Sequence, residues 1–158
     1  MKRHSEQHIG SRRLLLLVFA LFAVSLATGA GCLSIKLVAD YDATLDQSIT
    51  EFQKAMERHL TTLDRQIGTP ASDYNNHVSF YDDARVTLSS TRVRACAQSQ
   101  NEITVQQIDL LIENIAALET MHKQGLNRND IPPLRNAFNQ GCTAILKFEL
   151  EKKRGRDI

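Results

Sequence analysis

The sequence predicts an all-α protein: an antiparallel up-and-down bundle of about four helices, preceded by an N-terminal signal or anchor helix. After residue 36, apolar residues recur at intervals of three and four, which is the spacing of one face of an α-helix. Glycine and proline fall between these stretches, where helices end and begin. The expected connections are short, so consecutive helices should pack side by side and bury their apolar faces on one another.

The first 31 residues carry the features of an export signal. Four basic residues, the last of them Arg13, precede the uncharged segment 14–30, which ends in small residues. This arrangement is typical of a secretory signal, whose basic flank stays in the cytoplasm while the following chain is exported. We therefore assign residues 1–31 to a signal peptide or membrane anchor and residues 32–158 to the helical bundle domain.

Three fates of this N-terminal segment stay open. Small residues stand directly before Cys32, as in the lipobox of bacterial lipoproteins, and predict lipidation of Cys32, for instance with palmitate; Gly29 departs from that pattern, which prefers leucine there. Alternatively, cleavage after Ala30 by the ordinary signal peptidase would release a soluble periplasmic domain. An uncut segment 14–35 is the third fate, since it is long enough to span about 30 Å of hydrocarbon. We expect a lipoprotein that is anchored in a membrane and faces the periplasm.

The first helix of the bundle is predicted over residues 37–67, and Gly68 is placed to end it. Charged residues fill the positions opposite its apolar stripe. The stripe consists of Leu37, Tyr41, Leu45, Ile49, Phe52, Met56, Leu60, Leu63 and Ile67.

A second helix is predicted from Pro70, a favourable residue at a first helical position, to Gln98. Arg85 and Arg92 interrupt its apolar face. We expect these arginines to reach carboxylates on a neighbouring helix, with Asp42 or Asp46 as candidate partners, and so to set the register of the helices.

The last two helices have clear start signals. The sequence Thr104-Val105-Gln106-Gln107 has the form of a capping box, which predicts a third helix that runs from Thr104 to a stop at Gly125. Pro132-Pro133 begins a fourth helix with apolar residues at helical spacing. The basic residues 152–154 near its end should offset the negative end of the helix dipole.

Charge and motifs exclude several functions. The whole chain has a formal charge of +1, and from Cys32 onward 15 lysines and arginines face 17 aspartates and glutamates, a charge of −2. Nothing in this balance favours nucleic acid as a partner. The sequence contains no Gly-rich phosphate loop, no G-x-S-x-G turn and no Cys-x-x-Cys-His haem motif. We therefore predict neither enzymatic activity nor a cofactor.

Histidines and carboxylates give little indication of a metal site. His59, His77 and His122 are predicted on separate helices as isolated structural residues. The spacing Glu119-x-x-His122 occurs in di-metal carboxylate bundles, but such a site needs a second copy on a facing helix, and the sequence has none. We predict no metal ligands.

Cys96 and Cys142 are candidates for a disulfide, because the predicted domain is exported to an oxidising compartment. Counting residues along the predicted helices places them at similar heights in the bundle. A bond then requires the two helices to be neighbours, with Cα atoms within about 7 Å. The alternative is a pair of buried free thiols.

Several segments of the exported part resemble a family of small uncharacterised envelope lipoproteins from Gram-negative bacteria. The similar segments are 41–46, Phe80-Tyr81-Asp82, Arg92-Val93-Arg94-Ala95, 101–107, Phe138-Asn139, 143–147, Glu149-Leu150 and Lys152-Lys153. The resemblance covers nearly the whole exported chain. It implies tethered residence in the cell envelope and no assigned activity, cofactor or partner.

Two functional interpretations follow. The first is a membrane-anchored periplasmic lipoprotein that acts by contact with an envelope protein. The second is a ligand- or metal-binding bundle of the sensor type, in which Asp42, Asp46 and one histidine line a site. The two interpretations differ in whether these side chains converge in the folded protein.

Overall fold

The computed structural model describes residues 38–155, which belong to one compact unit. These residues form four α-helices and contain no strand, so the predicted all-α class is confirmed for them. The predicted N-terminal signal or anchor helix and Cys32 lie outside the described residues. The elements are α2 (Ala43–Gln66), η1 (Pro70–Ser72), η2 (Tyr74–Asn76), α3 (Val78–Cys96), α4 (Glu102–Gln124), η3 (Arg128–Asp130) and α5 (Ile131–Arg154), where η marks a single 3-10 turn.

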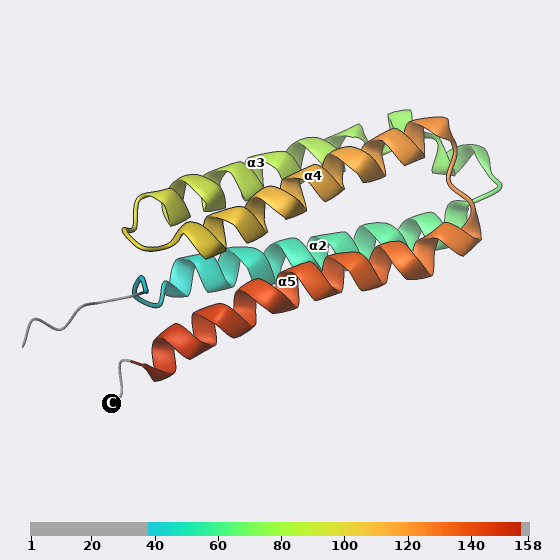
Figure 1. Ribbon diagram of the computed structural model, residues 1–158. Helices are drawn as coiled ribbons and strands as arrows, with labels where there is room; N and C mark the ends of the chain where they lie inside the picture. Colours follow the sequence, from blue (N-terminus) through green and yellow to red (C-terminus); the bar gives the residue numbers. More distant parts are fainter. Residues whose placement is uncertain (1–37, 156–158) are drawn as a thin grey trace, which may run out of the picture. The chain divides into compact units, whose positions relative to one another are not determined.

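The four helices form an up-and-down bundle (Figure 1). α2 packs beside α3 and α5, and α4 also packs beside α3 and α5, so α3 lies diagonally across from α5. The start of α2, the α3–α4 connection and the end of α5 share one end, here called the proximal end. The 3-10 turns lie at the opposite, distal end. No helix within residues 38–155 has both the length and the apolar character needed to cross a membrane.

Each helix contributes one buried apolar stripe to the core, as the helical spacing predicts. Burying these side chains is the main favourable term in folding. Fully or almost fully buried are Leu45, Ile49, Phe52, Met56, Leu60, Leu63, Tyr81, Leu88, Ile108, Leu111, Ile115, Leu118, Ile131, Phe138 and Ile145.

α2 begins later than the apolar stripe suggests. The Asp42 side chain accepts hydrogen bonds from the backbone N–H groups of Thr44 and Leu45, at 2.9 and 3.2 Å, and so caps the helix. Tyr41 therefore precedes the helix and is half-buried there. Gly68 follows the helix with φ +88°, a left-handed conformation that glycine adopts without strain.

The prediction of one helix from Pro70 to Gln98 is wrong at its start. Residues 70–76 form η1 and η2, and the α-helix begins only at Val78. Asp73 is responsible, because its side chain accepts a hydrogen bond from the backbone N–H of Asn75 at 2.9 Å and so ends the first turn.

The predicted capping box at Thr104 is also wrong. α4 begins at Glu102, which makes Thr104 an interior helical residue, fully buried, whose hydroxyl donates to Glu149 at 3.3 Å. A capping box does occur before α5, between Asn127 and Asp130. α5 then begins at Ile131, with proline in its first turn as predicted.

Candidate functional site

Three histidines that are far apart in the sequence bring their rings together at the distal end. His59 comes from α2, His77 from the residue between η2 and α3, and His122 from the last turn of α4. The ring centroids are 5.3 Å apart for His59 and His77, 6.2 Å for His59 and His122, and 5.2 Å for His77 and His122. The prediction of isolated histidines is therefore wrong, and we call this group the histidine cluster.

Hydrogen bonds to carbonyl oxygens set the tautomers of two of these rings. His122 Nε2 lies 2.8 Å from the carbonyl oxygen of Ser72, and His77 Nε2 lies 3.0 Å from that of Ala71. Because a carbonyl oxygen can only accept, each Nε2 carries a proton. In the neutral ring, His122 Nδ1 then accepts from the hydroxyl of Tyr81, 2.8 Å away. Both nitrogens of His122 are thus engaged.

His59 is the most enclosed ring of the cluster, in a residue that is only 6% exposed. It stacks on Phe80, with centroids 3.7 Å apart and planes within 8°, and meets the edge of Tyr81 at 5.5 Å. Its Nε2 is buried and has no hydrogen-bond partner among the described residues. Burial, and then the neighbouring His77 and His122, lower the pKa of His59 to about 3.

The pKa of His122 is also lowered, chiefly by burial and further by His77. The hydrogen bond to Ser72 and the carboxylate of Asp73 act in the opposite direction. His59 and His122 are therefore neutral near pH 7.

Glu119 holds the neighbouring charges together. Its carboxylate accepts from Tyr74 Oη at 2.6 Å, pairs with Arg85 of α3, and pairs with Lys123 of its own helix at 2.8 Å. Lys123 Nζ also lies 4.7 Å from the centroid of the Tyr74 ring. These contacts tie η2 to both α3 and α4.

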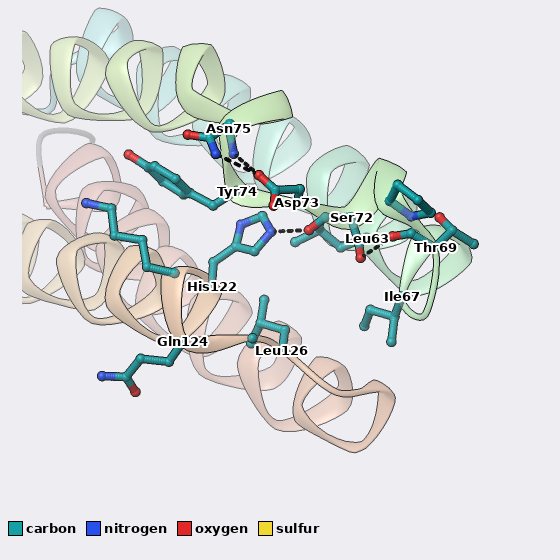
Figure 2. Close-up of a pocket in the computed structure, with 13 residues that line it drawn as sticks. Leu63, Ile67, Thr69, Ser72, Asp73, Tyr74, Asn75, His122, Gln124 and Leu126 are labelled. Atoms are coloured by element: carbon teal, nitrogen blue, oxygen red, sulfur yellow. Dashed lines mark hydrogen bonds between the residues drawn. The ribbon is translucent and has the colours of Figure 1, made fainter.

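A cavity of about 400 Å³ opens beside the histidine cluster, between residues 69–75 and the end of α4. Figure 2 shows His122 pointing towards Ser72, with Ile67 and Leu126 on one side of it and Tyr74 on the other. The wall thus combines apolar side chains with hydrogen-bonding groups. Of the three histidines, only His122 lines the cavity.

Within residues 38–155, no three histidine, cysteine, aspartate or glutamate side chains are placed to hold a metal ion. In the Glu119-x-x-His122 spacing, the carboxylate and the imidazole are both engaged with other partners. The geometry of the distal end is suited to contacts through rings and hydrogen bonds.

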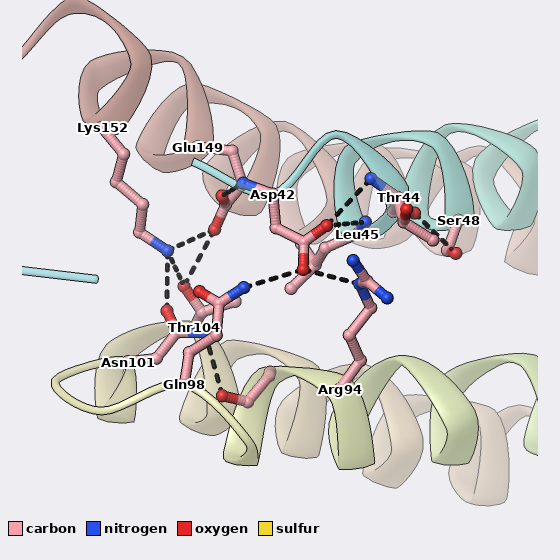
Figure 3. Close-up of polar contacts among 11 residues, drawn as sticks. Asp42, Thr44, Leu45, Ser48, Arg94, Gln98, Asn101, Thr104, Glu149 and Lys152 are labelled. Carbon is pink, nitrogen blue, oxygen red and sulfur yellow. Dashed lines mark hydrogen bonds and ion pairs between the residues drawn. The ribbon is translucent and has the colours of Figure 1, made fainter. Parts of the chain in front are cut away.

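A second polar group lies at the proximal end, around the cap of α2 (Figure 3). Asp42 Oδ2 accepts from Arg94 Nε at 2.6 Å and from Gln98 Nε2 at 2.8 Å, while Oδ1 caps the helix. Burial alone would raise the pKa of the Asp42 carboxyl, but the hydrogen bonds from Arg94 and from the backbone of Leu45 and Thr44 hold it below its usual value.

Glu149 and Lys152 of α5 form a buried ion pair next to this cap. The ammonium of Lys152 also donates to Asn101 Oδ1 at 2.7 Å and to Thr104 Oγ1 at 3.0 Å, so each of its three N–H groups has an acceptor. Glu149 Oε2 accepts from the backbone N–H of Asp42 at 3.2 Å. The proximal network, defined as these residues with Arg94 and Gln98, joins all four helices (Figure 3).

The arginine partners differ from those predicted. Arg85 pairs with Glu119 and Asp82, and Arg92 makes two bonds to Asp109, at 2.5 and 3.1 Å. Both arginines lie on the side of α3 that faces α4. Arg94 is two residues, or about 200°, further round the helix than Arg92, so it is Arg94 that reaches α2.

The candidate disulfide between Cys96 and Cys142 is not formed, so the alternative of two free thiols holds. Both thiols are free: Cys96 is exposed at the end of α3, and Cys142 is buried in α5. The prediction needed neighbouring helices, whereas α3 and α5 are diagonal in the bundle. Burial raises the pKa of the Cys142 thiol to about 12.

Asp42 and Asp46 do not share a site with any histidine of the described residues. Asp46 Oδ2 accepts from Tyr41 Oη at 2.8 Å, close to the cap of α2. His59 lies 17 residues beyond Asp42 in the sequence, which is about 25 Å along the helix. The second interpretation is wrong in its choice of residues.

The buried pair on α5 was missed, although the sequence carries a signal for it. Glu149 and Lys152 continue the apolar stripe of Phe138, Cys142 and Ile145 at the same helical spacing, which places them in the core. The role given to Lys152, offsetting the helix dipole, is therefore incomplete.

No protein-family model, curated protein or solved structure matches this chain.

Proposed function

We propose that this protein is a membrane-anchored lipoprotein of the cell envelope, fastened through Cys32 and facing the periplasm, that acts by binding a partner protein. Support for the anchor comes from the basic flank, the apolar run and the small residues before Cys32. Support for binding comes from one structural contrast. The proximal end, to which the N-terminal segment is joined, is closed by a buried polar network, whereas the distal end is open around a cavity.

A partner recognises groups that are accessible. Neither η1 nor η2 contains a buried residue, and Asp73, Asn75 and Gln124 are exposed around the mouth of the cavity. At the proximal end, Lys152 and Glu149 form their hydrogen bonds with other groups of the protein and are buried. The distal end is therefore our candidate binding surface.

We propose binding and not catalysis because the cavity offers no available general base among its histidines. His122, the only one of the three that lines it, uses both ring nitrogens on Tyr81 and Ser72.

Site-specific photo-cross-linking in living cells tests the binding surface. A photoreactive residue at Asn75 or Gln124 of the full chain should give a discrete cross-linked adduct with an envelope protein. The matched control places the same residue at Ser90, which is exposed but lies midway along α3. Equal adducts from all three positions, or adducts from Ser90 alone, would contradict a distal binding surface.

A small molecule is a second candidate occupant of the distal end, and the cavity itself is the observation in its favour. Leu63, Ile67 and Leu126 would cover an apolar part, while the carbonyl ends of α2 and α4 and the carboxylate of Asp73 favour a hydrogen-bond donor or a cation.

Native mass spectrometry of the protein isolated from membranes tests this second candidate. A bound molecule should appear as a discrete added mass that disappears in Leu126→Arg, which puts a long charged side chain at the cavity. Gln140→Arg, at an exposed position of α5 away from the cavity, should keep it. An added mass that survives Leu126→Arg places the molecule elsewhere.

A further inference from the structure

We infer that the histidine cluster is an acid-operated catch, which releases residues 69–77 from the bundle when it takes up protons. We call residues 69–77, which contain η1 and η2, the strap. The inference goes beyond the proposed function, because it does not depend on the identity or presence of a partner.

The strap is held mainly through the half-buried rings of Tyr74 and His77, which contact rings of the bundle. Neither of its 3-10 turns contains a buried residue. Two hydrogen bonds join it to α4, one from His122 Nε2 to the Ser72 carbonyl at 2.8 Å and one from Tyr74 Oη to Glu119 at 2.6 Å. A segment with so little buried surface opens at a lower free-energy cost than the helices it covers.

The histidine cluster cannot hold a proton on His59 while it stays closed. The ring is enclosed by Phe80, Tyr81, His77 and His122, and its Nε2 has no acceptor or donor opposite it among the described residues. A buried imidazolium without a partner is strongly disfavoured. Water can solvate the charge only if a wall of the enclosure moves, and His77 is the wall that belongs to the strap.

The surrounding charges do not compensate a proton on His59. On α4, Glu119 is already shared by Lys123, by Arg85 of α3 and by Tyr74 of the strap. The described carboxylates of α2 near this end are also paired, Glu57 with Arg135 of α5 and Asp64 with Arg128 of η3. Asp73 of the strap acts on His122 and raises the pKa of that ring. Within residues 38–155 no carboxylate forms a hydrogen bond or an ion pair with His59, so protonation there remains unfavourable in the closed state.

The direction of the pH effect follows from the pKa of His59. It is about 3 in the closed protein and about 6.5 for a histidine in water. Above pH 6.5 the His59 ring is neutral in both the closed and the released state, and the strap stays closed. Between pH 6.5 and 3 only the released state binds the proton, so the ratio of released to closed protein should rise about ten-fold for each unit that the pH falls.

Hydrogen exchange followed by mass spectrometry tests the catch in the full chain, purified in detergent micelles. The measured quantity is the protection factor, the observed rate relative to the unstructured rate at the same pH. Backbone N–H groups of Ser72, Asp73, Asn76 and His77 donate to carbonyl oxygens within the strap, so their exchange reports the unwinding of its 3-10 turns on release. Their protection should fall about 50-fold from pH 6.5 to 4.5, while that of residues 138–149 in α5 should stay constant.

Two variants separate titration from packing. His59→Phe keeps the stacked ring on Phe80 but cannot take up a proton, so the pH dependence of strap protection should flatten. Phe80→Leu is the matched control, because it loosens the same stack and keeps all three histidines. In this variant the protection of the strap should be lower at every pH, while its change per pH unit should equal that of the wild type.

Three results would overturn the inference: wild-type protection of the strap that does not change between pH 6.5 and 4.5, an equal slope in His59→Phe, or loss of protection in α5 together with the strap. The last result would mean that acid unfolds the whole bundle. The wild-type profile decides the question even if His59→Phe does not fold, which circular dichroism would reveal.

Discussion

Lys152 and Glu149 occupy positions of α5 that the helical period assigns to the core, yet both carry charge. The cost of removing two charges from water is offset here because each remaining hydrogen-bonding group of the pair has a partner, from Asn101, Thr104 or the backbone of Asp42. Such a pair contributes little net stability compared with apolar residues, but it becomes very unfavourable when one partner is removed. At the scale of single residues, the proximal network therefore specifies how the four helix ends meet.

Lys152→Met should lower the free energy of unfolding by about 3–5 kcal/mol, because it leaves the Glu149 carboxylate buried and unpaired. Urea denaturation of the purified protein measures this change. The double variant Lys152→Met with Glu149→Leu should recover most of the loss, since no charge then remains in the core. Arg154→Met removes a pair on the same helix whose side chains are 74% and 63% exposed, and should leave stability nearly unchanged. A single variant as stable as the wild type would show that the pair is not buried.

The two described cysteines should differ sharply in reactivity. Cys96 is exposed and should react with iodoacetamide in the folded protein, while Cys142 is buried with a pKa of about 12 and should react only after unfolding. Peptide mapping by mass spectrometry without reductant measures the labelling of each residue. A peptide pair joined by a Cys96–Cys142 disulfide would contradict the arrangement of α3 and α5.

At the scale of elements, the sequence predicts the helices better than the segments between them. Long apolar stripes, proline in the first turn of α5 and glycine after α2 and α4 are strong local signals. They locate the end of α2 and the starts of α4 and α5 to within two residues, whereas α2 begins six residues later than predicted. The conformation of the strap cannot be predicted from such signals, because Pro70 is as good a start for a 3-10 turn as for an α-helix. The break between the two turns depends on the Asp73 carboxylate, which accepts hydrogen bonds from the backbone and side-chain N–H groups of Asn75.

Close packing of α4 on α5 depends on Gly141. A Cβ atom at this position would lie 2.8 Å from Leu111 Cδ2, and Leu111 is itself only 1% exposed. Gly141→Leu should therefore lower the free energy of unfolding by about 1–3 kcal/mol through overpacking, as urea denaturation can measure. Gly155→Ala is the control, since its Cβ would meet atoms no closer than 3.6 Å. A Gly141→Leu variant of unchanged stability would mean that α4 and α5 pack less closely than described.

At the scale of the whole molecule, the two ends of the bundle have different characters. The fold class and the buried positions of Glu149 and Lys152 follow from local periodicity, but the contacts between helices at the two ends could not be predicted in this way. The histidine cluster joins residues that are 18 and 45 positions apart along the chain, so nothing in the local sequence around His59, His77 or His122 indicates their contact. Helix order brings them together, because the end of α2, the start of α3 and the end of α4 meet at one end of an up-and-down bundle.

The closed proximal end and the open distal end are consistent with our proposal that the protein is anchored through its N-terminal segment and binds a partner at its distal end. The anchor at Cys32 is therefore our central proposal, and the mass of the mature protein tests it most directly. Intact mass spectrometry of the protein from the membrane fraction of a Gram-negative host should show a chain that starts at Cys32 and carries acyl groups. Cys32→Ser should abolish that mass. A wild-type chain recovered from the cytosol with Met1 and no acyl group would contradict the account.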